Sequence, residues 1–401
     1  MPNEPRVNDY TLVHEKTKQA VQALRELGLG AWLLMGRETL EMADPSLALV
    51  VGTTVTWTSI FLITADSEHT AIVGTYDKPN LANTGNFTHV IDYVGSPRDA
   101  LLDALRRVDP QSIAINISAS DKMADGLTVG LYHKLVEYLD GTPWASRLVP
   151  SDKLVSAVRG RKSAAEIARV RAAIDTTLAL FERVGQRLAP GQTEAEIHGM
   201  VSEWVADLGL TMAWDAEYCP TVHNGARPIG HTTAGDYKVT PGTIVHMDLG
   251  VKQDGYCSDL QRVWYVSRGA GDTPPVELTR AFETVVAAIQ AGAAALKPGV
   301  PGWEVDAVAR KVVTDAGYPE YLHAFGHQVG RAVHDGMGLL GPRWERYGET
   351  PLMPVEVGNI FTLELGVEVP GIGYVGLEED VLVTESGVEW LAPPQTQLYV
   401  V

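Results

Sequence analysis

Two aspartates, Asp248 and Asp259, lie in apolar stretches on either side of a Lys-Gln-Asp-Gly turn sequence centred near residues 253 and 254. An Asp-Gly pair tolerates the positive φ of tight hairpins. We therefore expect strands over 243–251 and 256–266 to fold back and bring both carboxylates close together. Such charges in apolar surroundings repel each other and are costly to desolvate, and a cation between them removes both problems.

The same design recurs nearer the C-terminus. Glu364 lies in the apolar segment 361–366, a Pro-Gly-Ile-Gly turn follows, and Glu378 returns in the segment 375–380. A hairpin centred near Gly371 would place these two glutamates opposite each other. One isolated acidic residue at a strand end is commonly solvated or bound to backbone, but two acidic hairpins of one design predict a single site with four carboxylates.

Three histidines lie between the two hairpins, at His323, His327 and His334. Gly326 and Gly330 allow close backbone approach and leave the imidazole of His327 accessible. Four carboxylates with one imidazole and no thiolate favour Mn²⁺ or Mg²⁺ and tolerate Co²⁺, Fe²⁺ or Zn²⁺. Four negative charges suit two divalent ions, which can share carboxylates and hold a bridging water as hydroxide near neutral pH. The pattern therefore predicts a hydrolytic centre.

An internal repeat organises the second part of the chain. A Leu-x-Pro-Gly sequence ends at Gly191 and again at Gly299, and Gly209 is echoed by Gly317, each pair being 108 residues apart. Each copy combines a long helix that ends at Pro-Gly, a second helix that ends at Gly, and a later acidic hairpin. The repeat predicts two pseudo-symmetric αβ halves, each of which contributes one acidic hairpin to a shared central site.

The first part of the chain, residues 1–155, has a different pattern. Apolar strand candidates such as 31–35 alternate with helical stretches such as 97–108. This alternation predicts a smaller α/β domain whose expected roles are assembly and shaping the mouth of a site. The second domain, 156–401, opens with a capping box that starts at Ser163. The fold class expected for the whole chain is α/β (α+β).

Composition and charge argue against several classes of protein. The 401 residues are 45% hydrophobic and carry a net charge of −18, which argues against binding to nucleic acid or anionic membranes. No run approaches the roughly 18 apolar residues of a membrane span, and the N-terminal sequence lacks the apolar core of a signal peptide. The two cysteines are too few for a disulfide framework and predict a reducing, cytoplasmic location.

The order Asp, Asp, His, Glu, Glu resembles the ligand order of the creatinase-fold (pita-bread, M24) metallopeptidases, which include methionine aminopeptidases, Xaa-Pro aminopeptidases and Xaa-Pro dipeptidases (prolidases). Asp259 follows Asp248 by the family spacing of eleven, and His327 lies in a Gly-His-x-x-Gly motif. The family's second histidine, seven residues later, falls on His334, and its third, seventeen residues before the first aspartate, falls on His231. The resemblance covers the second domain, and the first domain resembles that of the proline-specific members.

This resemblance implies a dinuclear metal centre. Asp248 would bind one metal ion, and His327 and Glu364 would bind the other. Asp259 and Glu378 would bridge the two ions. Mn²⁺ is the expected metal, with Co²⁺ or Zn²⁺ as alternatives.

The resemblance also implies a reaction and a substrate. The bridging hydroxide would attack the scissile carbonyl of an Xaa-Pro bond, with Glu364 as general base and then general acid. His231 and His334 would hold the substrate and steady the oxyanion. The implied substrate is a small peptide, in the first place a dipeptide, with proline after the scissile bond. The implied assembly is a homodimer.

Three departures from the family pattern and one ambiguous ligand leave alternatives open. Gly376 replaces an arginine two residues before the last glutamate, Asp335 replaces the glutamate after the second histidine, and Gln328 replaces a glycine after the first. Glu379 is an alternative to Glu378 as the last ligand, although the Val-Leu-Val that follows favours Glu378. Because of the missing arginine, an Xaa-Pro aminopeptidase of longer peptides is one alternative. A metal-free creatinase-like hydrolase or a non-catalytic binding protein is the alternative of another class.

Overall fold

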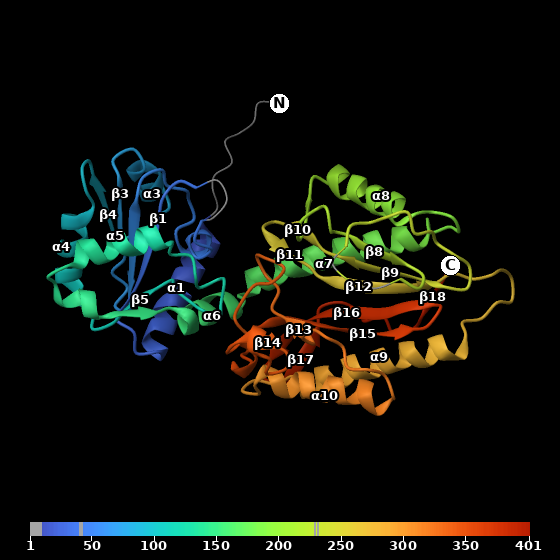
Figure 1. Ribbon diagram of the computed structural model, residues 1–401. Coiled ribbons are helices and arrows are strands. Elements are labelled where there is room, and N and C mark those ends of the chain that lie inside the picture. Colours follow the sequence, from blue (N-terminus) through green and yellow to red (C-terminus); the bar gives the residue numbers. More distant parts are fainter. Residues whose placement is uncertain (1–9, 40–42, 228–229, 231) are drawn as a thin grey trace. The chain divides into compact units, whose positions relative to one another are not determined.

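The computed structural model describes residues 10–39, 43–227, 230 and 232–401. The chain forms two compact units, residues 1–159 and 160–401 (Figure 1). Each unit contains its own sheet and its own hydrophobic core. In the described part of the chain, no helix is both long enough and apolar enough to cross a bilayer.

The first unit is built on a six-stranded sheet with the order β4-β3-β2-β1-β5-β6. Its elements are α1 (Thr11–Glu26), β1 (Ala31–Gly36), α2 (Leu47–Val50), β2 (Ser59–Thr64), β3 (Thr70–Gly74), α3 (Lys78–Asn83), β4 (His89–Tyr93), α4 (Arg98–Val108), β5 (Ile113–Ile115), α5 (Val129–Leu139), η1 (Pro143–Ser146), β6 (Leu148–Pro150) and α6 (Asp152–Gly160).

Strand β1 is the centre of this sheet, and its continuous apolar sequence Ala-Trp-Leu-Leu-Met-Gly is buried along its whole length. It pairs antiparallel with β2 and parallel with β5. Leucines of α4 and α5, including Leu105 and Leu135, pack against Leu33 and Ile113 of the sheet. The alternation of strands and helices in the sequence thus correctly predicted an α/β unit.

The second unit contains a larger sheet with the order β15-β16-β12-β9-β8, to which β17 and β18 add at β16 and β12. Its elements are α7 (Ala164–Gly185), α8 (Glu194–Asp207), β7 (Thr211–Met212), β8 (Thr221–Asn224), β9 (Ile244–Leu249), β10 (Val251–Gln253), β11 (Tyr256–Cys257), β12 (Leu260–Tyr265), α9 (Val276–Ala295), α10 (Gly302–Asp315), β13 (Gly326–His327), β14 (Leu339–Leu340), η2 (Glu345–Tyr347), η3 (Thr350–Leu352), β15 (Ile360–Val369), β16 (Gly373–Thr384), β17 (Gly387–Trp390) and β18 (Tyr399–Val400).

Helices α7 and α8 each begin at a capping box. The Ser163 hydroxyl accepts from the backbone of Glu166 and completes the expected capping box at the start of α7. Helix α7 ends at Gly185, five residues before the Pro-Gly at residues 190 and 191 where the sequence predicted its end. A second capping box, with Thr193 as the N-cap, starts α8.

The internal repeat is a structural duplication. Helices α8 and α10 have equal lengths, and both of their ends are 108 residues apart. The backbone N–H of Gly191 donates to Val239 at 2.9 Å, and that of Gly299 donates to Val355 at 2.8 Å. Helices α9 and α10 pack together, and α9 covers β15 and β16, whereas α7 contacts β10, β11 and β12 (Figure 1). The predicted pair of αβ halves is therefore confirmed.

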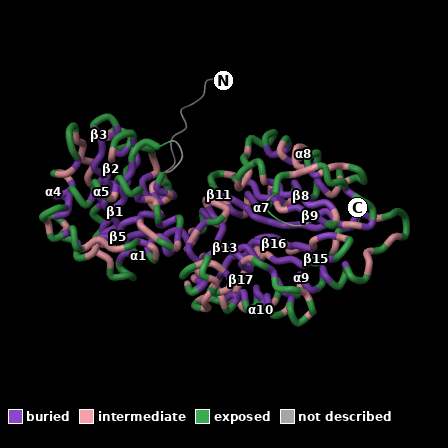
Figure 2. The backbone as a smooth tube through the Cα atoms, viewed as in Figure 1, coloured by how far each residue is buried: buried purple, intermediate pink, exposed green. Residues whose placement is uncertain are grey.

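Strand β15 packs one face into the hydrophobic core of the second unit, and its other face carries polar residues. Leu363, Leu365 and Val367 join the hydrophobic cluster that includes Phe282 and Ile289 of α9. Because successive strand residues point to opposite faces, Glu364 points away from this helix. Figure 2 shows the buried residues along the central strands, while exposed and buried residues alternate along α8.

Candidate metal centre

The first acidic hairpin turns at Asp254 and Gly255, which both have positive φ, 49° and 79°. Its strands pair so that Asp248 of β9 lies opposite Gln261 of β12. The sequence placed the centre of this hairpin one residue too early, because Gln253 pairs with Tyr256 and remains in the strand. Asp259 is consequently the diagonal neighbour of Asp248, not its direct partner.

The second acidic hairpin has the predicted register, with Glu364 of β15 directly opposite Glu378 of β16. Strand β16 also pairs with β12, where Glu378 lies opposite Gln261. The side chains of Asp248, Gln261, Glu378 and Glu364 therefore form one row across four adjacent strands. This row joins the two hairpins in a single site.

His327 reaches the row from β13, which lies beside β15. The backbone of Glu364 donates to Phe325 at 2.7 Å, and the backbone of His327 donates to the hydroxyl of Thr362 at 3.2 Å. The imidazole Nε2 then lies 3.5 Å from Asp259 Oδ2 and 3.7 Å from Glu364 Oε1. It lies 4.0 Å from Glu378 Oε1. Residues distant in the sequence thus converge on one point.

The carboxylates in this cluster have perturbed acidities. Burial raises the pKa of Asp259, and the negative charges of Glu378 and Asp248 raise it further. Burial also raises the pKa of Glu378, followed by the charges of Glu364 and Asp248. For Asp248, burial and then the charge of Glu364 raise the pKa. Each shift has the direction expected of carboxylates placed together without a compensating cation.

The donor atoms fit divalent cations. One ligand atom each from Asp259, His327 and Glu378 lie within 4.8 Å of one another. Asp248 Oδ1, Asp259 Oδ1 and Glu378 Oε1 are buried and have no hydrogen-bond partner among the residues that the structure describes. Buried carboxylate oxygens without donors are unfavourable, and metal coordination would satisfy them.

Glu379 points away from the cluster. Its Oε2 lies 3.0 Å from Arg262 Nη2, and its Oε1 accepts from the backbone of Gln395 at 2.8 Å. Glu378 occupies the position in the cluster because neighbouring strand residues face opposite sides. Asp380, which the sequence did not single out, accepts from the backbone N–H of Asp259 at 3.1 Å and so helps to orient that segment.

His334 is the second predicted histidine that lies at the cluster. The ring of His334 lies next to that of His327, with 4.2 Å between the ring centroids. His231 lies outside the described residues. The structure therefore brings together the five predicted ligands and places His334 beside them.

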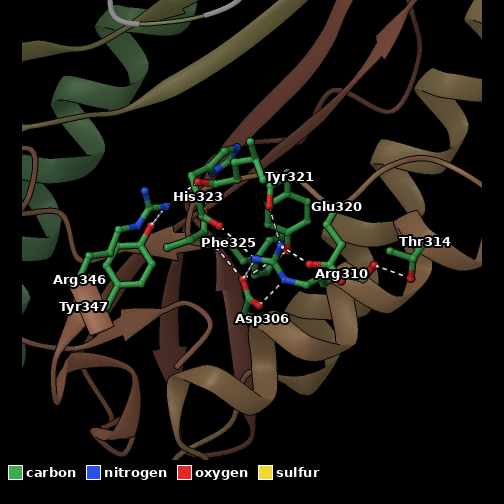
Figure 3. A network of polar contacts seen from close by, with 11 residues as sticks. Asp306, Arg310, Thr314, Glu320, Tyr321, His323, Phe325, Arg346 and Tyr347 are labelled. Atoms are coloured by element: carbon green, nitrogen blue, oxygen red, sulfur yellow. Dashed lines mark hydrogen bonds and ion pairs between the residues drawn. The ribbon is translucent and has the colours of Figure 1, made fainter. Parts of the chain in front are cut away.

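A buried ion pair fixes the segment that leads to His327 (Figure 3). Asp306 and Arg310 of α10 form this pair at 2.8 Å. Arg310 donates to the backbone oxygens of Tyr321 and His323 at 2.6 and 3.0 Å. Asp306 accepts from the backbone N–H of Phe325 at 3.2 Å. The sequence offered a signal for this pair only in its i, i+4 spacing on a helix.

Two of the departures from the family pattern meet at one buried lysine. Lys162 Nζ lies 3.5 Å from Gln328 Oε1 and 3.9 Å from Asp335 Oδ2. The backbone of Asp335 donates to the backbone oxygen of Gln328 at 2.7 Å. The buried lysine provides a charge partner for Asp335, so these residues support the loop after His327.

The third departure, Gly376, is explained by crowding. A Cβ atom at this position would lie 2.5 Å from the ring of Tyr374 and 2.8 Å from His246 Nε2. These distances are shorter than van der Waals contact, so Tyr374 and His246 fill the space that a side chain would need.

The second unit consists of two αβ halves, and each half contributes one acidic hairpin to a common sheet. A histidine between the two hairpins completes the site. This arrangement defines a pita-bread metallohydrolase. Comparison with known proteins identifies the group. The sequence profile of the family described as "Metallopeptidase family M24" matches residues 168–385. The chain therefore belongs to metallopeptidase family M24, and members of this family use divalent metal ions.

Relatives in sequence and structure agree with this assignment. The chain is 32% identical over 241 residues to an uncharacterized peptidase of Staphylococcus saprophyticus, an alignment that spans 60% of this chain and 65% of that protein. Its fold is similar to that of the Xaa-Pro dipeptidase from Bacillus anthracis, with a TM-score of 0.74, 24% identity, and coverage of 97% and 100% of the two chains. The X-Pro aminopeptidase from Thermotoga maritima gives a TM-score of 0.70 at 24% identity, with coverage of 96% and 99%.

Proposed function

We propose that the protein is a dinuclear metal-dependent peptidase that hydrolyses Xaa-Pro bonds, preferentially in dipeptides. The convergence of Asp248, Asp259, His327, Glu364 and Glu378 at one point is the observation that carries this proposal. Four carboxylates and one imidazole are a donor set for two divalent cations. Buried oxygens of Asp248, Asp259 and Glu378 have no hydrogen-bond partner among the described residues. Mn²⁺ is the proposed metal, with Co²⁺ or Zn²⁺ as alternatives.

Each ligand has a proposed place in this centre. Asp248 would hold one ion, His327 and Glu364 the other, and Asp259 and Glu378 would bridge them. When bound, such ions supply Lewis acidity and lower the pKa of a coordinated water into the neutral range. The residues of the chain fix where this chemistry can occur.

Glu364 is the proposed proton carrier. Its side chain is 21% exposed, compared with 2% for Glu378 and 7% for Asp259, so it is more accessible than they are to water and substrate. A carboxylate in this position can accept a proton from water and return it to the leaving amine. His334 is exposed beside His327 and is proposed, together with His231, to hold the substrate and the developing oxyanion.

Proline after the scissile bond suits a pocket that reads ring shape, since proline has a fixed φ and no amide hydrogen. Two proteins of similar fold are an Xaa-Pro dipeptidase and an X-Pro aminopeptidase. We extend the chemistry of these two proteins to this chain. We further propose that the protein is a cytoplasmic homodimer, and light scattering would test the dimer.

Hydrolysis of Xaa-Pro dipeptides with Mn²⁺ or Co²⁺, before and after chelation, tests the proposal. We expect activity that is lost with the metal and restored by it. Asp259→Asn should abolish it, because it removes a bridging ligand. Asp254→Asn in the exposed turn of the same hairpin is the matched control and should keep wild-type activity. Hydrolysis that persists unchanged after complete removal of metal would refute the proposal.

A second comparison decides the chain length of the substrate. A dipeptidase should cleave an Xaa-Pro dipeptide faster than the matching Xaa-Pro-Xaa tripeptide. A cleaved tripeptide beside an intact dipeptide would make the protein an Xaa-Pro aminopeptidase. Elemental analysis that finds no metal, with no gain of activity on adding it, would favour a metal-free hydrolase or a binding protein.

A further inference from the structure

Gln261 is the one uncharged member of the row of side chains that crosses the four central strands. It lies between Asp248 on one side and Glu378 on the other, with Glu364 next in line. Like charges directly opposite each other on neighbouring strands are unfavourable. An amide at the middle of the row separates the carboxylate of the first hairpin from those of the second.

We propose that Gln261, held in one orientation by His246, is a positioning residue that selects which oxygens of Glu378 and Glu364 face the metal ions. This inference rests on the proposed dinuclear function. It concerns two residues that bind no metal themselves, and it follows from the hydrogen bonds around the amide.

The amide nitrogen of Gln261 contacts both glutamates of the second hairpin. Nε2 donates to Glu378 Oε2 at 2.8 Å, and it lies 3.4 Å from Glu364 Oε2. The other oxygen of each carboxylate is turned toward His327, whose Nε2 lies 3.7 Å from Glu364 Oε1 and 4.0 Å from Glu378 Oε1. In both glutamates, Oε2 faces the amide of Gln261 and Oε1 faces His327 in the cluster.

Glu378 Oε1 is also one of the buried oxygens without a hydrogen-bond partner among the described residues. Its neighbour Oε2 accepts from Gln261. The amide therefore satisfies Oε2, and Oε1 would be the oxygen through which Glu378 bridges the two cations. A hydrogen bond of this kind fixes the orientation of a metal-ligating carboxylate.

His246 determines which end of the amide faces the glutamates. Its Nε2 lies 2.9 Å from Gln261 Oε1, and an amide oxygen only accepts hydrogen bonds, so the imidazole carries its proton on Nε2. Rotating the amide by half a turn would place its oxygen against two carboxylates and its nitrogen against an N–H donor. Both contacts would then be repulsive, so a single orientation is stable.

Packing prevents His246 from moving out of this position. Its ring stacks on His223 with centroids 5.9 Å apart and an interplanar angle of 11°, and the edge of Tyr374 meets it at 5.5 Å. Gly376 lies close behind, with no room for a Cβ atom.

Metal titration of the purified, metal-stripped protein tests this assignment. The variant Gln261→Met keeps the length of the side chain and loses the amide. We expect its affinity for Mn²⁺ to fall by about 10- to 100-fold, as is typical when a partner of a metal ligand is removed. The visible spectrum of the Co²⁺-loaded protein should change as well, because the oxygens presented to the metal change.

Two further variants complete the experiment. Gln253→Leu removes a glutamine from the same hairpin at a position whose side chain contacts Thr176, and it should bind Mn²⁺ like the wild type. His246→Phe keeps an aromatic ring but leaves the amide of Gln261 free to rotate, and it should also weaken binding. If Gln261→Met does not fold, the titration of His246→Phe decides the question.

The outcomes separate this inference from the function on which it rests. A wild-type protein that binds no divalent metal would refute the proposed dinuclear centre. The positioning role alone would be refuted if the wild type binds two ions and folded Gln261→Met has the same Mn²⁺ affinity and Co²⁺ spectrum as the wild type. If only His246→Phe folds, the same result in that variant would refute it.

Discussion

Replacing Arg262 by methionine tests the buried ion pair that joins β12 to β16. Arg262 and Glu379 lie 3.0 Å apart with side chains that are each 2% exposed. The guanidinium also donates to the backbone oxygens of Gln261 and Glu378 at 2.8 and 3.1 Å, so it holds both residues next to the cluster. Methionine fills much of the same volume but leaves the carboxylate of Glu379 buried without its cation.

The expected loss is large because the charge left behind cannot reach water. Removing one partner of a buried ion pair costs about 3–5 kcal/mol, whereas replacing both partners with apolar residues can be neutral or stabilising. We therefore expect Arg262→Met to lower the free energy of opening of β12 and β16 by about 3–5 kcal/mol. The double variant Arg262→Met, Glu379→Met should recover most of this loss.

Hydrogen–deuterium exchange with mass spectrometry measures this quantity for each segment separately, which suits a chain with two compact units. Peptides that cover β12 and β16 report the opening free energy. The control is Arg171→Met, which breaks a 2.6 Å pair with Glu389 whose side chains are 35% and 53% exposed. This exposed pair should contribute at most about 1 kcal/mol. A loss below about 1 kcal/mol for Arg262→Met, or a double variant no better than the single one, would refute the reasoning.

Three further predictions follow from the site. Gly376→Ala should destabilise the second unit by about 1–3 kcal/mol, because its Cβ would lie 2.5 Å from the ring of Tyr374; a melting temperature equal to that of the wild type would contradict this. Arg310→Met should lower kcat more than it raises KM, because the segment before His327 loses its anchors at Tyr321 and His323, and steady-state kinetics beside a circular dichroism melt would show it. In metal-free protein, burial raises the pKa of the cluster carboxylates above the unfolded value of about 4. The stability that these groups contribute is therefore complete below the unfolded pKa and is lost as the pH rises through the folded pKa. Calorimetry in chelator should therefore show that the melting temperature of the wild type falls from pH 5 to pH 8 relative to that of Glu378→Gln. Saturating Mn²⁺ should remove this fall. A melting temperature in chelator that rises with pH relative to that of Glu378→Gln would refute the prediction.

Local patterns in the sequence predicted the residues of the site and the duplication that builds it. Acidic residues in two apolar hairpins, with a histidine in a glycine-flanked motif between them, indicated a metal centre before any geometry was known. Gly371, whose φ is 76°, correctly predicted the turn that pairs Glu364 with Glu378. Such signals are local, since turn residues and strand alternation act over a few positions of the chain.

The packing of distant elements determines which side chains share a face and what each of them contacts. The pairing of β12 with β16 places Gln261 beside Glu378, although 117 residues separate them. Arg262 draws Glu379 away from the cluster. The first hairpin turns at Asp254 and Gly255, which have positive φ, so its centre lies one residue later than the sequence predicted. Contacts between distant segments depend on how whole elements pack, and no local pattern in the sequence contains that information.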